Sequence, residues 1–366
     1  MIIHSGAKHP EYLITACVMI LLVFGLIMLS SASSNLGEVK FGDTYYYLKH
    51  QALYGGLIGL IGFYLASKIP YKKYVKFSLP LLIISVILLV LIFTPLGVSA
   101  KGAKRWLSFF GIPFQPSETL KFTYIMYVAA WLGRRSERRK DFWKGFVPFL
   151  CVSALVAGLL LAQHSTSIVA ILILSGLIVY FVSGAKLRYI FGTVVLGLTV
   201  LTLVTYVTPY RFERIKNFLN PEDNALSGGY HLSQALIAIG SGSVKGVGYG
   251  QSTSKISTLP EPIGDSIFAV IAEETGFIGS MALITVFGIL IGKIFLVAWK
   301  KRDKFGQLML FGFGSVIAIQ TLVNIGAISG VLPLTGTPLP FISYGSTSLI
   351  VFLTMSGLVV NIIKSN

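Results

Sequence analysis

Charged residues are scarce in this sequence, and their scarcity excludes an ordinary soluble protein. Asp, Glu, Lys and Arg together make up 12% of the 366 residues, whereas a typical soluble domain carries about 25%. Hydrophobic residues make up 54%, and apolar runs of about 18 residues or more, each long enough to cross a bilayer core, recur along the chain. The composition therefore predicts a protein that crosses a membrane several times.

Cysteine and acidic residues are also few. The two cysteines, Cys17 and Cys151, lie inside apolar runs, so we expect no disulfide framework. Lys and Arg number 30 against 14 Asp and Glu, which gives a net charge of +16. In a soluble protein this excess would favour nucleic acid, but the cytoplasmic loops of membrane proteins collect Lys and Arg. We therefore expect no nucleic-acid partner.

Metal-ligand motifs are lacking in the sequence. The five histidines are scattered, and no pair of them has the spacing of a zinc site. A divalent cation such as Mg²⁺ or Mn²⁺ that is held by carboxylate and phosphate oxygens leaves no such motif. A divalent cation therefore stays open as a cofactor.

The hydropathy pattern predicts an all-α polytopic membrane protein with about ten transmembrane helices. We find no internal repeat and no soluble domain, so residues 1–366 are expected to form a single integral membrane domain. The expected spans are residues 12–33, 51–68, 77–98, 116–133, 145–162, 165–184, 187–207, 266–292, 306–330 and 341–363.

Basic residues predict the orientation of these helices. With the N-terminus inside, 18 Lys and Arg residues fall in the inner segments and 10 in the outer segments, although the inner loops are shorter. Cytoplasmic loops carry the excess of Lys and Arg. We therefore expect both termini in the cytoplasm and residues 208–265 on the extracytoplasmic side.

Two outer segments are longer than simple connections. Residues 99–115 join the third and fourth expected spans, and residues 208–265 join the seventh and eighth. Loops of that size in a compact protein are usually functional or disordered. Because aromatic and apolar residues run through the second segment, we expect it to fold against the bundle, with a short interfacial helix over residues 230–240.

The first candidate residues lie around the start of the fourth expected span. Glu118 and Lys121 are three residues apart, so they share a helix face and can pair, and Arg105 lies in the loop that leads to this helix. One interpretation is an ion pair that orients the helix. The other is a cationic site in which Arg105 and Lys121 bind a phosphate while Glu118 holds Lys121 in place.

The second group follows a glycine-rich stretch at residues 240–252. Its glycines, including Gly248 and Gly250, allow a backbone to approach a phosphate and present N–H groups to it, although a flexible loop explains them equally well. The stretch leads to Lys255 and then to Asp265, which opens the eighth expected span. Asp265 either caps that helix or acts as a base at the mouth of a membrane cavity.

Long, ordered motifs around these residues resemble the SEDS family (shape, elongation, division and sporulation), whose members include FtsW, RodA and SpoVE. The resemblance covers nearly the whole chain, and residues 209–211 and 246–252 are more similar to the FtsW branch than to RodA. The motifs that carry it are residues 29–33, 104–106 with 114–121, 210–215 with 218–221, 234–242, 259–261 with 265–274, and 324–345, which ends on Ser343-Tyr344-Gly345.

Three departures from the family pattern are visible. Ser346 stands where a second glycine usually follows the signature tyrosine, and residues 163–165 replace a turn that usually carries proline and often an acidic residue. Ile263 and Gly264 replace a common His-Thr pair. This last change removes two polar side chains beside Asp265.

The resemblance implies a peptidoglycan glycosyltransferase in the bacterial cytoplasmic (inner) membrane. Such an enzyme polymerises lipid II at the outer face, with undecaprenyl diphosphate as the leaving group, in cell division or shape maintenance. A class B penicillin-binding protein, which is a transpeptidase, and other proteins of the division or elongation complex are the implied partners. Asp265 is the implied catalytic base, and the implied substrate contacts come from Arg105, Glu118, Lys121, Lys255, Gly248, Gly250 and Ser343.

Two other classes of function stay open at this point. A flippase or transporter for the same lipid-linked precursor would also carry charged groups inside its bundle, and a division scaffold would need no chemistry of its own. The candidate residues gather at the outer side, whereas a flippase needs a pathway through both leaflets. This placement favours the enzyme.

Overall fold

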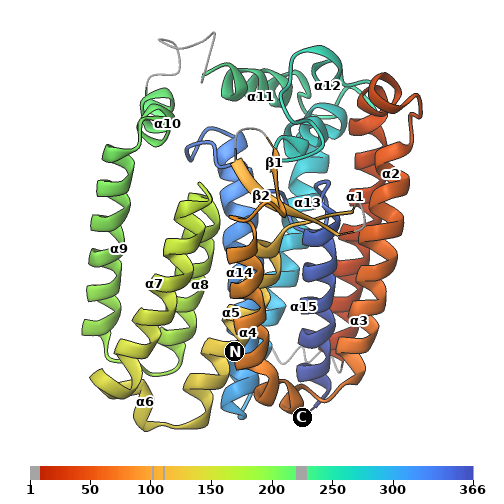
Figure 1. The fold of residues 1–366 in the computed structure, drawn as a ribbon. Helices are drawn as coiled ribbons and strands as arrows, with labels where there is room; N and C mark the ends of the chain where they lie inside the picture. Colours follow the sequence, from red (N-terminus) through yellow and green to blue (C-terminus); the bar gives the residue numbers. More distant parts are fainter. Residues whose placement is uncertain (1–8, 101–102, 110–111, 220–228, 366) are drawn as a thin grey trace, which may run out of the picture.

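The computed structural model describes residues 9–100, 103–109, 112–219 and 229–365. Within these ranges the chain is a bundle of long helices that run roughly along one axis (Figure 1). The helices of the bundle are α1 (Pro10–Phe41), α3 (Ile58–Lys68), α4 (Tyr74–Leu91), α5 (Pro116–Arg134), α7 (Val147–Ala162), α8 (Thr166–Val182), α9 (Leu187–Val207), α13 (Ile267–Lys300), α14 (Lys304–Ile328) and α15 (Ser346–Lys364).

Short helical segments join or extend the long helices. Two of them are π-helical and one is a 3-10 helix, and they continue directly into α3, α7 and α4. The short segments are α2 (Tyr46–His50), η1 (Gln51–Leu57), η2 (Tyr71–Lys73), α6 (Glu137–Lys140), η3 (Phe142–Phe146), α10 (Pro209–Leu219), α11 (Tyr230–Ser241) and α12 (Ser254–Ser257).

The helix ends follow recognisable local signals. Helix α1 has Pro10 in its first turn and ends at Gly42, which adopts a left-handed conformation (φ 64°) while its N–H bonds the carbonyl of Glu38. Helix α14 starts after Asp303, whose carboxylate accepts a hydrogen bond of 2.8 Å from the N–H of Gly306. Such caps satisfy backbone groups that have no partner within the helix.

A helix occupies each of the ten expected spans. Seven helical stretches in the described part of the chain are long and apolar enough to cross a membrane, while α8 is apolar but shorter. The expected spans at 51–68 and 116–133 correspond to η1 with α3 and to α5, which fall outside those seven. The count of ten crossings therefore stays a prediction, whereas the helical multi-pass architecture is established.

One segment differs from the all-α expectation. Helix α4 ends at Leu91, short of the expected residue 98, and the chain then forms a three-stranded antiparallel sheet of β1 (Gly97–Ala100), β2 (Ala103–Phe109) and β3 (Ile112–Phe114). Leu107 pairs with both Gly97 and Phe114. The strands are too short for hydropathy to reveal, and the sheet lies in the half of the bundle that carries α10 to α12 (Figure 1).

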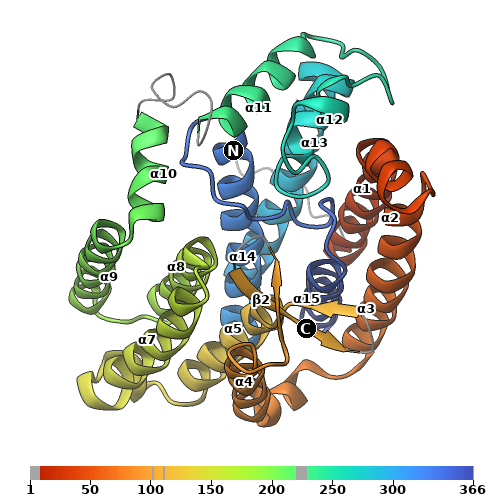
Figure 2. The ribbon, with the colours of Figure 1, turned by 45° about the horizontal axis from the view of Figure 1, so that its top comes forward.

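The long segment between α9 and α13 folds over one end of the bundle. Its expected short helix is confirmed as α11, whose buried residues Leu232, Ala235 and Ala238 lie on one face, and α11 packs against α13 and α14 (Figure 2). Residues 220–228 of this segment lie outside the described residues. Helix α6 and the C-terminal end of α15 lie at the opposite end of the bundle (Figure 1).

Candidate functional site

Asp265 lies one residue ahead of the cap of α13. The helix begins at Ile267 with Ser266 at its N-cap position, and the Ser266 hydroxyl lies 2.6 Å from His231 Nε2 and donates to the carbonyl of Pro260 at 2.7 Å. Capping was one of two interpretations of Asp265, and the cap position belongs to its neighbour. The placement of Asp265 therefore favours a role for its carboxylate outside the helix.

The main chain of Asp265 is held by a polar face of α14. Asn324 donates from its amide nitrogen to the carbonyl of Asp265 at 2.9 Å and to the carbonyl of Thr337 at 2.7 Å. A Cβ atom built on Gly336 would lie 3.6 Å from Asp265 Oδ2. The carboxylate of Asp265 is thus beside the segment that joins α14 to α15.

Ser343 holds the residues that precede Asp265. Its hydroxyl donates to the carbonyl of Gly264 at 2.7 Å and accepts a hydrogen bond of 2.7 Å from the N–H of Leu339. The N–H of Tyr344 donates to the carbonyl of Ile263 at 2.8 Å. Both hydrogen bonds use the backbone carbonyls of Ile263 and Gly264, so they do not depend on which side chains stand at these two positions.

Arg105 contacts the turn between α7 and α8. Its guanidinium donates from Nε to the carbonyl of Gln163 at 3.2 Å and from Nη2 to the carbonyl of His164 at 2.5 Å. From α10, Arg211 donates to the carbonyl of Leu161 at 3.1 Å. Two guanidinium groups from separate segments therefore meet at one turn on the end of the bundle that carries α10 to α12.

A third arginine links this turn to the surroundings of Asp265. Arg214 donates to the carbonyl of Leu334 at 3.2 Å, and Ser167 at the start of α8 donates to the carbonyl of Thr335 at 2.9 Å. Leu334 and Thr335 therefore contact Arg214 and Ser167, and the next residue, Gly336, lies beside Asp265. From the sequence, Arg211 and Arg214 fall in an expected outer segment and in a family motif, but neither is expected to be a site residue. Their occurrence against the trend of basic inner loops was the available signal.

Glu118 and Lys121 form the expected ion pair. Lys121 Nζ lies 2.8 Å from Glu118 Oε2 and donates to Gln320 Oε1 at 2.6 Å, and each residue is only 1% exposed. The ammonium also lies 5.1 Å from the centroid of the Phe352 ring. The pair is enclosed between α5, α14 and α15, and this geometry favours the interpretation in which it orients α5.

Lys255 is also enclosed by partners. Its ammonium lies 2.6 Å from Glu274 Oε1 and donates to Ser31 Oγ at 2.7 Å and to the carbonyl of Gly250 at 2.9 Å. The side chains of Lys255 and Glu274 are 3% and 0% exposed. The pair therefore joins the glycine-rich loop to α1 and α13.

The glycine-rich loop inserts into a kink of α13. Gly276 interrupts that helix with φ 66° and ψ −165°, and the N–H groups of Val247 and Gly248 donate to the carbonyls of Glu273 and Glu274 at 3.0 and 3.1 Å. A Cβ on Gly246 would lie 2.2 Å from the carbonyl oxygen of Glu274. The glycines thus allow close approach between two backbones, and the N–H of Gly248 is used inside the protein.

Comparison of the sequence with known proteins gives one family. The family model of FtsW, RodA and SpoVE, described as a cell cycle protein, matches residues 11–366. A relative from Geobacter sp. (strain M18), named probable peptidoglycan glycosyltransferase FtsW, is 35% identical over 96% of this chain and 96% of its own length. Stage V sporulation protein E of Bacillus subtilis (strain 168) is 33% identical, with 96% of each chain covered.

Solved structures share the fold. A chain from a peptidoglycan synthase complex that couples polymerization and crosslinking is 26% identical, covers 96% of both chains and has a TM-score of 0.78. The crystal structure of the rod shape determining protein RodA of Thermus thermophilus is 25% identical, covers 96% of this chain and 95% of its own, and has a TM-score of 0.71. Because the family model and these relatives span almost the entire sequence, the chain belongs to the SEDS family of FtsW, RodA and SpoVE.

Proposed function

We propose that this chain is a peptidoglycan glycosyltransferase that polymerises lipid II into glycan strands, with a role like that of FtsW in cell division. Relatives at 35% and 36% identity are named probable peptidoglycan glycosyltransferases, which supports the activity. The proposal rests on the position of Asp265. Its carboxylate lies beside Gly336, and the segment that contains Gly336 also contacts Arg214 through the carbonyl of Leu334. A base and cationic groups thus share one end of the bundle.

Asp265 acts as the general base in this proposal. It takes the proton of an acceptor sugar hydroxyl, whose oxygen bonds the anomeric carbon of the donor sugar. The bond between that carbon and the diphosphate oxygen breaks, and its electron pair leaves with the undecaprenyl diphosphate. A single displacement inverts the anomeric carbon. Since diphosphate leaves readily, the general acid that glycoside hydrolysis requires is less necessary here.

The three arginines neutralise the diphosphate. Arg105, Arg211 and Arg214 lie at the turn between α7 and α8 and at residue 334, and guanidinium groups bind phosphate oxygens through two parallel hydrogen bonds. Among the residues that the structure describes, Arg211 donates to Thr208 and to the carbonyl of Leu161 and forms no ion pair. Arg105 keeps the phosphate-binding role expected from the sequence, and Arg211 and Arg214 replace Lys121, which is enclosed in its ion pair with Glu118.

The other candidate residues position this site. The enclosed Glu118–Lys121 and Lys255–Glu274 pairs hold α5 and the glycine-rich loop, with Gly248 and Gly250, against the bundle. The hydroxyl of Ser343 holds Gly264. We propose that these residues do not contact the reacting atoms and instead hold Asp265 and the arginines in position for catalysis.

A divalent cation fits this site only with oxygen ligands. No group of three His, Cys, Asp or Glu side chains that could hold a metal occurs among the described residues. Asp265 and the substrate diphosphate would hold Mg²⁺ or Mn²⁺, since such ions bind through one or two carboxylates and phosphates. When bound, the ion would supply charge stabilisation on the leaving diphosphate.

We place the enzyme in the bacterial cytoplasmic membrane with both termini in the cytoplasm. The support is the excess of basic residues at the end of the bundle opposite α10 to α12. Asp265 and lipid II then meet at the outer face. A reporter fused after Lys364 is expected to read as cytoplasmic, and a periplasmic signal would contradict this orientation.

A class B penicillin-binding protein of the division or elongation complex is the proposed partner. The support is the likeness to a chain of a peptidoglycan synthase complex. The expected contact is the exposed face of α13 just after its kink, where Phe277 and Ile278 are 63% and 59% exposed and the partly exposed Gly279 allows close approach. Crosslinks from a single-span partner that map exclusively to α1, α3 and α4 would exclude this face.

Purified protein in vesicles with lipid II tests the function. The expected product is an uncross-linked glycan polymer with release of undecaprenyl diphosphate, in the presence of the partner. A flippase would move lipid II between the leaflets without lengthening it, and a scaffold would do neither. Transfer of lipid II across the vesicle with no polymer would contradict the proposal in favour of the flippase.

A further inference from the structure

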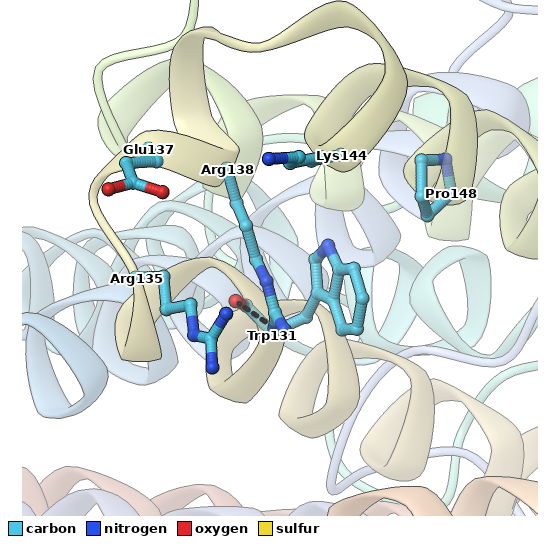
Figure 3. A pocket seen from close by; sticks show the side chains of 6 residues that line it. All are labelled: Trp131, Arg135, Glu137, Arg138, Lys144 and Pro148. Carbon is cyan, nitrogen blue, oxygen red and sulfur yellow. Dashed lines mark hydrogen bonds between the residues drawn. The ribbon is translucent and has the colours of Figure 1, made fainter.

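A basic cavity lies at the end of the bundle that is opposite Asp265. Its volume is about 290 Å³, and it is formed where the C-terminal end of α5 meets α6 and the start of α7 (Figure 3). The lining residues are Trp131, Arg135, Glu137, Arg138, Lys144 and Pro148. The cavity is separate from the proposed catalytic site.

Positive charge dominates this cavity. Arg138 lies over the Trp131 ring, with its guanidinium carbon 3.7 Å from the ring centroid (Figure 3). Among the described residues, no ion pair involves Arg135, Arg138 or Lys144. Burial, followed by the charges of Arg135 and Arg134, lowers the pKa of Arg138. Like charges are therefore crowded here, and an anion would relieve their repulsion.

An apolar cavity of about 210 Å³ lies next to the basic one along the same helices. Tyr127 of its lining is four residues before Trp131 on α5, and the two rings stack with their centroids 6.2 Å apart. On α7, Val152 of the apolar cavity is four residues after Pro148 of the basic cavity. The two cavities therefore lie one helical turn apart on both helices.

The apolar cavity opens toward lipid. Helix α4 forms its other wall with Leu79, Ile83 and Ile87, and each of these is about half exposed, at 50%, 49% and 52%. Leu155 on α7 is 55% exposed. In a helix that crosses a membrane, such apolar exposure marks the surface that lipid chains cover.

We propose that the two cavities form one binding site for an anionic glycerophospholipid. The phosphodiester lies among Arg135, Arg138 and Lys144, because basic cavities between membrane helices on the cytoplasmic side bind anionic head groups. One acyl chain lies along the groove between α4 and α7. A soluble phosphate would satisfy the cations but not the apolar groove, so the pair of cavities selects a lipid.

Native mass spectrometry of the full chain in detergent tests this site with phosphatidylglycerol and phosphatidylcholine. The wild-type protein is expected to retain phosphatidylglycerol in preference to phosphatidylcholine. The double variant Arg135→Gln with Arg138→Gln is expected to bind it about 30-fold more weakly, because each basic residue near anionic lipid contributes about 1 kcal/mol. Arg135→Lys with Arg138→Lys keeps both charges and is expected to keep most of the binding.

A matched control removes the same charge elsewhere at this end of the bundle. Lys300 and Arg302 are exposed and do not line the cavity, so Lys300→Gln with Arg302→Gln is expected to bind as wild type does. Equal losses in both double variants would overturn the site, since they would reflect net charge alone. Unchanged binding in the Arg135 and Arg138 variant would also overturn it.

The apolar groove is tested by a substitution that leaves every charge in place. Val152→Trp fills the groove next to Tyr127, and it is expected to reduce phosphatidylglycerol retention about as much as the loss of the two arginines. Melting temperatures without added lipid check that each variant is folded. If Val152→Trp retains the lipid, or inorganic phosphate displaces it, the site binds a soluble anion and the proposal is wrong.

Discussion

Ser343 donates a hydrogen bond of 2.7 Å to the carbonyl of Gly264, the residue directly before Asp265. A second bond from the N–H of Tyr344 to the carbonyl of Ile263 runs beside it. The C-terminal signature motif is thereby attached to the backbone that carries the proposed base. The placement of Asp265 depends on this attachment and on Asn324.

Ser343→Ala is expected to slow polymerisation. The substitution leaves the buried N–H of Leu339 without its hydroxyl acceptor and removes the bond to Gly264, and an unsatisfied buried polar group costs about 1–3 kcal/mol. If about half of that loss reaches the placement of Asp265, the rate falls about 2- to 10-fold. Polymerisation kinetics on lipid II measure the effect.

Ser329→Ala is the matched control for Ser343. The hydroxyl of Ser329 bonds only carbonyls of its own helix, those of Ile325 and Gly326, so its loss is expected to leave the rate unchanged. A rate for Ser343→Ala equal to that of Ser329→Ala would show that the attachment to Gly264 does not matter for catalysis.

Arg211→Gln is expected to weaken the use of lipid II. If Arg211 binds the diphosphate, removing one charge-assisted hydrogen bond costs about 1.5–3 kcal/mol, which lowers kcat/KM about 10-fold or more. Lys216→Gln on the same helix removes the same charge from an exposed position. Equal kcat/KM values for the two variants would argue against a phosphate contact by Arg211.

Removing one charge of the Lys255–Glu274 pair is expected to destabilise the protein more than removing both. Lys255→Met leaves the carboxylate of Glu274 buried without its cation, which costs about 3–5 kcal/mol. Lys255→Met combined with Glu274→Met removes both charges and is expected to recover most of the melting temperature. For comparison, the exposed pair of Lys49 and Asp43 is worth about 1 kcal/mol or less.

Thermal unfolding of wild type, Lys255→Met and the double variant in detergent gives the comparison. A double variant that melts no higher than Lys255→Met would mean that the ion pair contributes net stability and that the loss is not caused by an unpaired charge.

Gly276→Ala is expected to destabilise the protein strongly. Its φ of 66° is unfavourable for alanine, and a Cβ there would lie 2.3 Å from the backbone nitrogen of Gly246. Gly288 on the same helix has no atom within 4 Å of a Cβ, so Gly288→Ala is expected to be neutral or stabilising. Melting temperatures that fall equally for both substitutions would contradict the close contact of loop and kink.

Local patterns in the sequence were sufficient for the helices and for one ion pair. Long apolar runs place a helix at each expected span, and the spacing of Glu118 and Lys121 predicts their contact because residues three apart share a helix face. Aromatic and apolar residues likewise predict α11.

Contacts between distant segments could not be predicted in this way. The glycines at residues 240–252 resemble a phosphate-binding loop, but their N–H groups meet carbonyls that the kink at Gly276 releases. The sequence of neither the glycine-rich loop nor the kink predicts that these two segments contact each other. The partners of Lys255 on α1 and α13, and the meeting of Arg105 and Arg211 at one turn, depend on tertiary packing in the same way.

The rate of lipid II polymerisation by Asp265→Asn shows whether Asp265 is the catalytic base. Asn keeps the size of the side chain, and the bond from Asn324 to the carbonyl of residue 265 does not involve that side chain, so the variant is expected to fold and to bind precursor. Removal of a general base is expected to lower the rate about 10²–10⁴-fold. Asp43→Asn, which neutralises an exposed carboxylate paired with Lys49, is expected to retain the wild-type rate. A folded Asp265→Asn protein that polymerises lipid II as fast as Asp43→Asn would contradict the assignment of Asp265 as the base.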